Sequence, residues 1–124
     1  MIMKLKDQVC SLESAKRLKE LGIEQDSIFC YFHCSDDSFE LDYNTWKKTE
    51  IFPHEYISAF TVAELGEFLP PELDGLYFTS FRCARNGWWC EYSDGNGASM
   101  RSFWSKNEAE CRATLLINLM VKPQ

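Results

Sequence analysis

The fold is decided by residues 105–121, SKNEAECRATLLINLMV. Apolar residues recur along this stretch at helical spacing, and a second apolar stripe adjoins the first. The two stripes are Ala109, Ala113, Leu116, Ile117 and Met120, and Cys111, Leu115 and Leu119. A helix that is apolar around most of its circumference is buried on more than one side. We therefore predict a central helix between a sheet and other helices, with Leu116, Ile117 and Met120 against the sheet. The second stripe would meet the first helix or a second copy of the chain.

The start of this helix carries the pattern of a capping box. Ser105 can accept a hydrogen bond from the amide three residues on, and Glu108 can reach back to the Ser105 amide. Trp104 lies where it could close the entry turn as a hydrophobic staple. The same box recurs at Thr61 and Glu64, ahead of a helix that a Pro-Pro pair must end. A third helix begins after a serine and ends at a glycine. The predicted helices span 11–21, 61–69 and 105–121.

An Asn86-Gly87 dipeptide separates two runs in which aromatic side chains alternate with smaller ones. Asn-Gly suits a two-residue type I′ turn, which needs positive φ at both positions. We therefore predict a hairpin over 76–93 with its tip at Asn86-Gly87 and with Cys83 directly opposite Cys90. In this register one face carries Tyr77, Phe81, Cys83, Trp88, Cys90 and Tyr92, and the wetter face carries Phe78, Arg82, Ala84, Trp89 and Glu91.

Further strands are expected near 28–34 and 99–104. Residues 28–34 place apolar or aromatic side chains on both faces, which predicts a strand covered on both sides. The acidic residues 35–50 fit either a hairpin or a long solvated loop. The strands and the hairpin together predict one small antiparallel sheet packed against helices, which is an α+β fold. A chain of 124 residues is expected to form a single domain, 1–124.

The composition indicates the compartment of the protein and excludes some classes of partner. The net charge of −6 argues against general affinity for a nucleic-acid backbone, because phosphates repel an acidic surface. No apolar run is long enough to span a membrane, and the N-terminal residues lack the apolar core of a signal peptide. We therefore expect a cytoplasmic protein whose six cysteines are reduced thiols.

The cysteine and histidine spacings do not favour a metal site. If residues 28–34 are extended, Cys30 and Cys34 lie about 13 Å apart, and His33 faces the opposite side of the strand. Tetrahedral zinc instead holds its thiolate ligands about 2.3 Å from one ion. Cys83 and Cys90 could supply two ligands or a disulfide, but no matching second pair is evident. We expect two packed thiols there.

No catalytic constellation is recognisable. The two histidines, His33 and His54, lie in no nucleophile motif, and the chain contains neither a P-loop nor G-x-G-x-x-G. We therefore expect a non-enzymatic protein without a cofactor. The remaining class of function is recognition of a partner through the protein surface. The candidate contact residues are Phe78, Arg82, Trp89 and Glu91, because Trp, Arg and aromatic rings dominate interface hot spots. The alternative is that another element of the fold covers this face.

Three stretches resemble small uncharacterised proteins of tailed phages and prophages. They are VCSLESAKRLKELGI at 9–23, SAFTVAELGEFLP at 58–70, and the closing helix at 107–120. The resemblance covers about half of the chain and rests on caps and core positions, so it implies a shared fold. It implies no activity and no functional residues. Its implication for function is context, namely a small accessory protein acting in the cytoplasm of an infected bacterium.

Two classes of function follow. The first is a protein-binding module that contacts a host protein, for example to inhibit a host defence; the acidic surface and the aromatic hairpin favour it. The second is a binder of a small ligand such as a nucleotide signal, because aromatic rings can stack on a base. A homo-oligomer formed through 105–121 is compatible with both. A flat apolar patch would favour the first class, and a deep aromatic cleft lined by Arg or Lys would favour the second.

Overall fold

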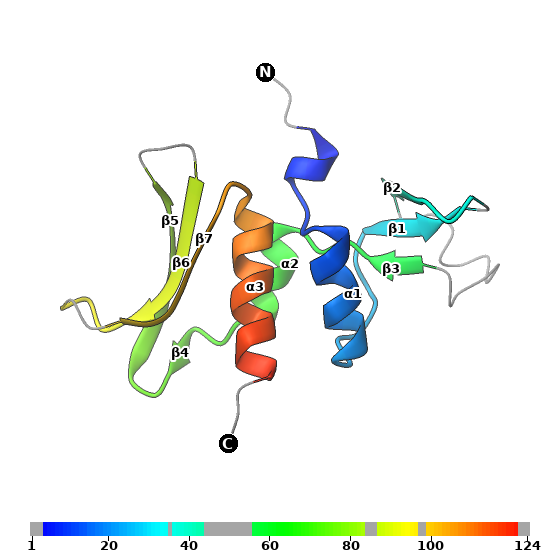
Figure 1. The fold of residues 1–124 in the computed structure, drawn as a ribbon. Helices are drawn as coiled ribbons and strands as arrows, with labels where there is room; N and C mark the ends of the chain where they lie inside the picture. The colour runs from blue at the N-terminus through cyan, green and yellow to red at the C-terminus, as the bar shows by residue number, and fades with distance from the viewer. Residues whose placement is uncertain (1–3, 35, 44–55, 84–86, 97–98, 122–124) are drawn as a thin grey trace.

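The computed structural model confirms the α+β class, and it describes residues 4–34, 36–43, 56–83, 87–96 and 99–121. Figure 1 shows the helices together in the middle of the molecule, with a small antiparallel sheet at either end. The helical elements are η1 (Leu5–Asp7), α1 (Leu12–Glu20), α2 (Val62–Phe68) and α3 (Glu108–Met120). The strands are β1 (Phe29–His33), β2 (Phe39–Tyr43), β3 (Tyr56–Ser58), β4 (Glu72–Leu73), β5 (Leu76–Cys83), β6 (Gly87–Ser93) and β7 (Ser99–Ser105).

The described strands form two sheets, whereas the sequence predicted one. One sheet has the order β2-β1-β3, and the other has the order β4-β5-β6-β7. The helices stand between them, so β1 cannot join the hairpin (Figure 1). The stretch after β1 begins as an antiparallel hairpin with β2, and residues 44–50 lie outside the described residues. Strand β1 is covered on both sides only at its start: Phe29 and Cys30, which point to opposite faces, are buried, whereas His33 at its other end is exposed.

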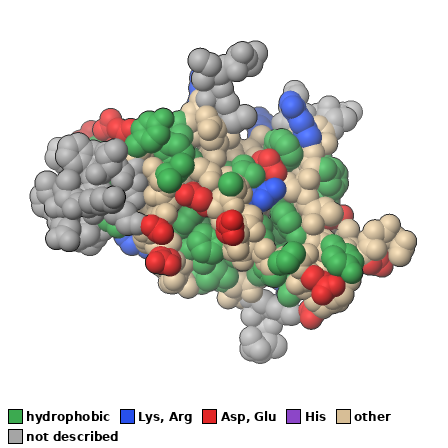
Figure 2. Space-filling model, turned by 180° about the vertical axis from the view of Figure 1, so that it is seen from behind, with side chains coloured by type: hydrophobic (Ala, Val, Ile, Leu, Met, Phe, Trp, Pro, Cys, Tyr) green, Lys and Arg blue, Asp and Glu red, His purple; other side chains and the backbone are tan. Residues whose placement is uncertain are grey.

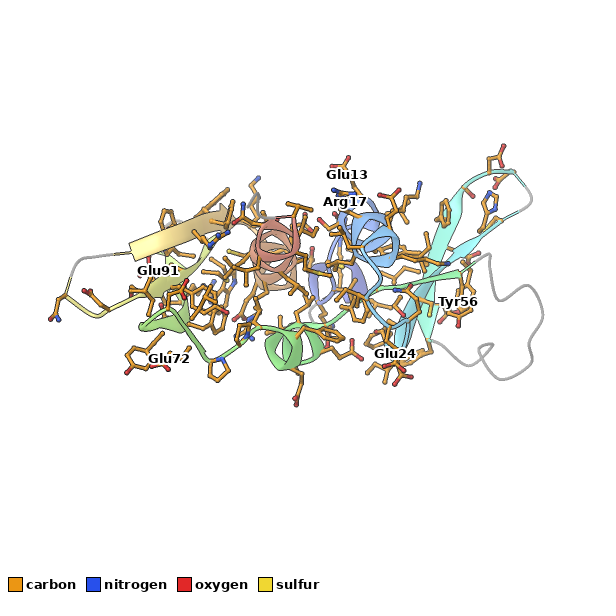
Figure 3. All side chains as sticks on the ribbon, turned by 90° about the horizontal axis from the view of Figure 1, so that it is seen from below. Glu13, Arg17, Glu24, Tyr56, Glu72 and Glu91 are labelled. Carbon is orange, nitrogen blue, oxygen red and sulfur yellow. The ribbon has the colours of Figure 1, made fainter. Side chains whose placement is uncertain are left out.

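Helix α3 is the central helix that the sequence predicted. It packs against α1, α2, β6 and β7, and Figure 3 shows it between the four-stranded sheet and α1. The main buried cluster draws on all three of these helices and on both sheets. Its largest fully buried side chains are Tyr92, Phe60, Leu18, Leu65 and Leu115.

The stripe of α3 that faces the sheet differs from the predicted one. The Cys111 thiol bonds to a carbonyl of β7 at 3.0 Å, and the Asn118 side chain accepts a hydrogen bond from β7. Leu115 lies on the same helical face between these two residues, and it is fully buried. Met120 is 38% exposed, so the prediction that it is buried against the sheet is wrong, whereas Leu116 is buried and Ile117 packs against the main buried cluster. The chain itself buries Leu115, without a second copy.

The predicted capping box at Ser105 and Glu108 is also wrong. Ser105 is the last residue of β7, because its pairing with β6 keeps it extended. The N-cap is Asn107, whose side-chain oxygen accepts a hydrogen bond from the Glu110 amide at 3.0 Å. Asn is as good an N-cap as Ser, so the helix can begin at Glu108 without the box. The Glu108 side chain is thereby left for a contact with β5.

The other two helix starts follow the sequence. The Ser11 side chain accepts from the Ser14 amide and caps α1, and Gly22 ends that helix with φ of 93°. Thr61 and Glu64 form the predicted capping box at α2. Glu64 also accepts hydrogen bonds from the segment that leads into β1, so this one carboxylate fixes both the helix start and the approach of the first sheet.

Strands β5 and β6 form the predicted hairpin, but its register is wrong by three residues: Cys83 pairs with Gly87 rather than with Cys90. Gly87 is the first residue of β6, and its φ is not positive, so it is not a turn residue. Asn86 lies outside the described residues. A Cβ on Gly87 would overlap the Trp104 indole of β7. Glycine is therefore required here by a close approach between strands, not by turn geometry.

This odd shift moves the side chains of β5 to the opposite face from the predicted one, because side chains alternate with period two. The inner face, toward α3, carries Leu76, Phe78, Ser80, Arg82, Trp88, Cys90 and Tyr92. The outer face carries Tyr77, Thr79, Phe81, Cys83, Trp89, Glu91 and Ser93. Cys83 and Cys90 thus lie on opposite faces, and all six cysteines are free thiols.

Candidate functional site

The outer face of the four-stranded sheet carries a group of exposed aromatic side chains. Phe81, Trp89 and Trp104 lie directly opposite one another on β5, β6 and β7. Tyr77 lies on the same face of β5, four residues before Phe81. Tyr77 is 57% exposed, Phe81 47% and Trp104 49%, while Trp89 is half-buried. We call these four residues the aromatic face. The described helices lie on the other side of this sheet (Figure 1).

Two carboxylates share the outer face. Glu91 follows Trp89 by two residues along β6, and one of its oxygens, Oε1, accepts hydrogen bonds from Trp89 Nε1 at 2.7 Å and from Ser102 Oγ at 3.4 Å. Glu72 lies on β4 opposite Tyr77. Figure 3 shows both glutamates at the end of the molecule that the four-stranded sheet occupies. No lysine or arginine occupies an outward position among the described residues of these strands.

Local contacts fix the orientation of the two indoles. The bond to Glu91 holds the Trp89 ring, and the absence of a side chain at Gly87 lets the Trp104 ring approach the β6 backbone. A bulge interrupts the pairing of β6 with β7, where Arg101 adopts φ of 58°. Its guanidinium turns inward and donates to the side chain and the carbonyl of Asn118 on α3. A bulge of this kind re-aims side chains, and here it anchors β7 to the central helix.

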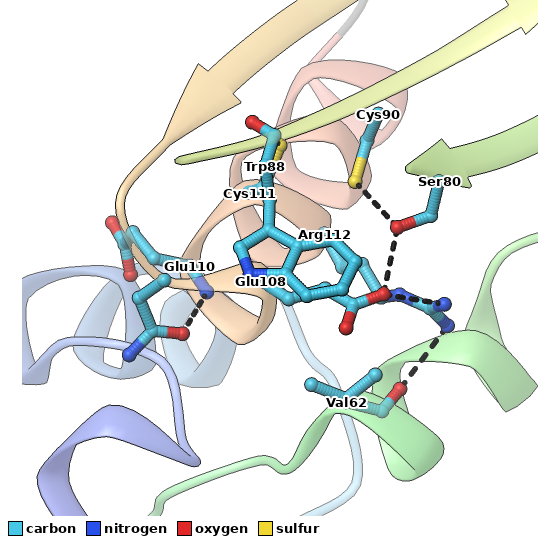
Figure 4. Close-up of polar contacts among 9 residues, drawn as sticks. Val62, Ser80, Trp88, Cys90, Glu108, Glu110, Cys111 and Arg112 are labelled. Carbon is cyan, nitrogen blue, oxygen red and sulfur yellow. Dashed lines mark hydrogen bonds and ion pairs between the residues drawn. The ribbon is translucent and has the colours of Figure 1, made fainter. Parts of the chain in front are cut away.

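A partly buried polar network supports the sheet from its inner side (Figure 4). Ser80 Oγ of β5 donates to Glu108 Oε2 at 2.7 Å, and the Arg112 guanidinium donates to the same oxygen at 3.0 Å. Arg112 also donates to the Val62 carbonyl of α2 at 3.3 Å and lies over the Phe78 ring, 5.1 Å from its centroid. The network thus joins β5, α3 and α2.

The sequence candidates are divided between the two faces. Trp89 and Glu91 are brought together on the outer face, as predicted. Phe78 and Arg82 lie on the inner-face positions of β5, where Phe78 packs under a guanidinium of α3. The prediction that these four residues share one surface is therefore wrong. Arg82 is nevertheless exposed.

Sequence reasoning missed Tyr77, Phe81 and Trp104. The signal for the first two was present, because a connection of three residues between the strands places Phe81 opposite Trp89. The strong turn preference of Asn-Gly favoured the shorter connection instead. Trp104 was assigned to a hydrophobic staple, yet it is the outward residue of β7 opposite Trp89.

The cysteines of the core are closed to solvent. Cys10, Cys90 and Cys111 are fully buried. Burial raises the pKa of Cys10 to about 12. The hydrogen bond between Cys90 and Cys111 raises the pKa of Cys111 and lowers that of Cys90. A thiol without access to solvent cannot meet an external substrate, so these cysteines are packing residues of the core. In the part of the chain that the structure describes, no three metal-binding side chains gather in one place.

Comparison with known proteins leaves the function to be argued from this site. No family model, no curated protein and no solved structure matches the chain. Among the described residues, no helix has the length and apolar character needed to cross a bilayer. Fold and site together define the class: an α+β protein whose four-stranded sheet exposes aromatic side chains on its outer face, beside Glu72 and Glu91.

Proposed function

We propose that the chain is a non-enzymatic accessory protein of a tailed phage or prophage that binds a host protein through its aromatic face. The phage context rests on the sequence resemblance of residues 9–23, 58–70 and 107–120. The mode of action rests on the aromatic face. The protein acts in the cytoplasm of the infected cell and inhibits a host function, such as a defence system, by occupying its surface.

The observation that carries this proposal is the exposure of Tyr77, Phe81 and Trp104 on one side of a sheet. Aromatic side chains of about 200 Å² each, exposed by about half, offer roughly 300 Å² of apolar surface. Exposed apolar patches of that size on small proteins are often functional. A stable interface buries about 800 Å² on each partner, and its centre is typically aromatic. The aromatic face has the size and composition of such a centre.

Rigidity favours the same function. The strands of the aromatic face are tied to the helices by the Glu108–Arg112 pair, whose side chains are only 18% and 17% exposed. Binding to a preformed surface avoids the entropic cost of ordering loops. The small-ligand alternative has less support, because Glu72 and Glu91 make the face unfavourable for a phosphate group.

Affinity capture from a lysate of the bacterial host tests the proposal. The bait is the wild-type chain, and the test bait carries Tyr77→Ser and Phe81→Ser, which remove the exposed rings of β5. The matched control is Ile28→Ser, because Ile28 is 61% exposed at the opposite sheet. Mass spectrometry should identify a host protein that is enriched by wild type and by Ile28→Ser, and at least about tenfold depleted with the test bait.

Equal recovery of that protein by all three baits would show that the aromatic face is not the contact surface. Circular dichroism of each bait confirms that it is folded before the comparison is made. Mass spectrometry of small molecules released from the same baits covers the nucleotide alternative. A nucleotide retained by wild type without an enriched protein would replace the proposed function with ligand binding.

A further inference from the structure

We propose that the aromatic face recognises arginine side chains on an extended basic segment of its protein partner. This inference rests on the proposed function and specifies the chemistry of the partner. It starts from the charges on the outer face. The described outward positions hold two carboxylates, Glu72 and Glu91, and no cation that could neutralise them.

The placement of Glu91 makes charge complementarity the central requirement. Glu91 lies two residues along β6 from Trp89, so it is the next outward side chain after the row of Phe81, Trp89 and Trp104. Tyr77 lies in the outward row on the other side of Glu91, opposite Ser93. A partner that covers the rings therefore also covers this carboxylate. Desolvating a carboxylate without a compensating charge is costly, so an apolar or acidic partner is disfavoured. In the described part of the chain both hydrogen bonds of Glu91 end on Oε1, which leaves Oε2 to accept from a ligand.

The shape of the site favours arginine over lysine. A guanidinium is planar, stacks on aromatic rings and donates two parallel hydrogen bonds to a carboxylate. Indole is the best aromatic partner for a cation, and two indoles, Trp89 and Trp104, lie opposite each other beside Glu91. These rings stand on an open sheet face and not in a cage. An open face suits stacking of a planar group, whereas an ammonium gains most when aromatic rings surround it.

The second carboxylate sets the spacing of the ligand. Glu72 lies two strands away from Glu91 and two residues further along the sheet. Strand spacing and rise per residue place their Cα atoms about 12 Å apart. An extended segment spans about 13 Å between residues i and i+4, and these two side chains point to the same side. A segment with two arginines four residues apart can therefore reach both carboxylates.

The probe is a labelled peptide, Gly-Arg-Thr-Ser-Thr-Arg-Gly, titrated into the full-length protein. Two matched peptides carry lysine or citrulline in place of arginine; citrulline keeps the planar shape and removes the charge. The indole N–H resonance of Trp89 reports the contact directly, because that group bonds to Glu91. Fluorescence anisotropy gives the affinity, and added salt should weaken binding. The arginine peptide should shift the Trp89 resonance and bind more tightly than the lysine peptide.

Glu91→Gln keeps an acceptor for Trp89 Nε1 but removes the charge, and it should weaken the arginine peptide about threefold to tenfold. The control is Glu24→Gln, an exposed glutamate on the side of the central helices away from the four-stranded sheet (Figure 3), and it should bind as wild type. Equal binding of the citrulline peptide, unchanged binding by Glu91→Gln, or an unshifted Trp89 resonance each overturns the inference. If the resonance stays unshifted while Tyr77→Ser with Phe81→Ser still loses the host protein, the docking function stands and only the arginine chemistry fails.

Discussion

Gly87→Ala tests the contact that shapes the aromatic face. The added methyl group would overlap the Trp104 indole, and the three heavy atoms nearest to the place that this methyl group would occupy all belong to the indole ring. The φ of Gly87 is outside the left-handed region, so alanine can adopt the native backbone without strain. The substitution therefore isolates one steric contact between β6 and β7.

The expected magnitude follows from two opposing effects. Overpacking a well-packed site typically costs about 1–3 kcal/mol, and Trp104 is 49% exposed, so it can partly turn away and keep the cost below the upper end, at about 2 kcal/mol. Replacing glycine by alanine at a compatible position also stabilises by about 0.4–1 kcal/mol, because the unfolded chain loses freedom. The net effect in the wild-type background should be a loss of about 1 kcal/mol.

The sign should reverse when the indole is removed. In a Trp104→Ser background nothing opposes the methyl group, so Gly87→Ala should stabilise the protein by about 0.4–1 kcal/mol. Urea unfolding of the four proteins of this cycle, followed by far-ultraviolet circular dichroism, measures both values and their coupling. Circular dichroism is chosen because two of the four proteins lack the Trp104 fluorophore.

Two results would refute the reasoning. An equal loss of stability in both backgrounds would mean that glycine is required by the backbone, as a turn residue is. No loss in either background would mean that the Trp104 ring does not lie over Gly87. In the second case the indole of Trp104 would also take another position on the aromatic face.

Three further predictions concern the core and a helix cap. Leu115→Ala should cost about 2–5 kcal/mol because Leu115 is fully buried, whereas Met120→Ala should cost less than about 1 kcal/mol, since Met120 is 38% exposed; urea unfolding compares them. Glu64→Ala removes the capping box and the bonds to the segment before β1, and should cost about 2 kcal/mol or more, against little change for the exposed Glu67→Ala. The Cys10 thiol stays protonated to about pH 12 in the folded chain but ionises near 9.0 when unfolded. The free energy of unfolding should therefore fall as pH rises above 9.0 toward 12. Cys10→Ala should make this decline shallower in unfolding curves measured at several pH values.

The elements that the sequence predicted well are those whose signals are local. The capping box at Thr61 and Glu64 and the cap and terminating glycine of α1 depend on residues within one or two turns, and both helices occur as predicted. The central position of α3 was predicted from the apolar residues that surround most of the helix, and it occurs as predicted. The N-cap at Asn107 was missed because two good capping residues lie two positions apart, and only the pairing of β7 with β6 decides between them.

The arrangement of the site depended on a signal that is not local. Pairing in a hairpin follows from the length of its connection, and an odd error exchanges the two faces of one strand relative to the other. The prediction therefore kept Trp89 and Glu91 together, since both belong to β6, and misplaced Phe78 and Arg82, which belong to β5. The division into two sheets could not be predicted from local sequence signals either, because it depends on which elements α3 separates in space.

The outer aromatic rings are not required by the packing of the fold. The inner face of the same strands already supplies the buried Cys90 and Tyr92, and the Glu108–Arg112 network ties β5 to the helices from that side. Tyr77 and Phe81, by contrast, leave about half of their surface in water. Removing an exposed ring should cost much less stability than removing a buried one, because little apolar surface changes its environment. Under the proposed function, stability and binding are therefore separable: substitutions at Tyr77 and Phe81 should abolish partner binding in a folded chain, whereas substitutions at Leu115 should unfold it.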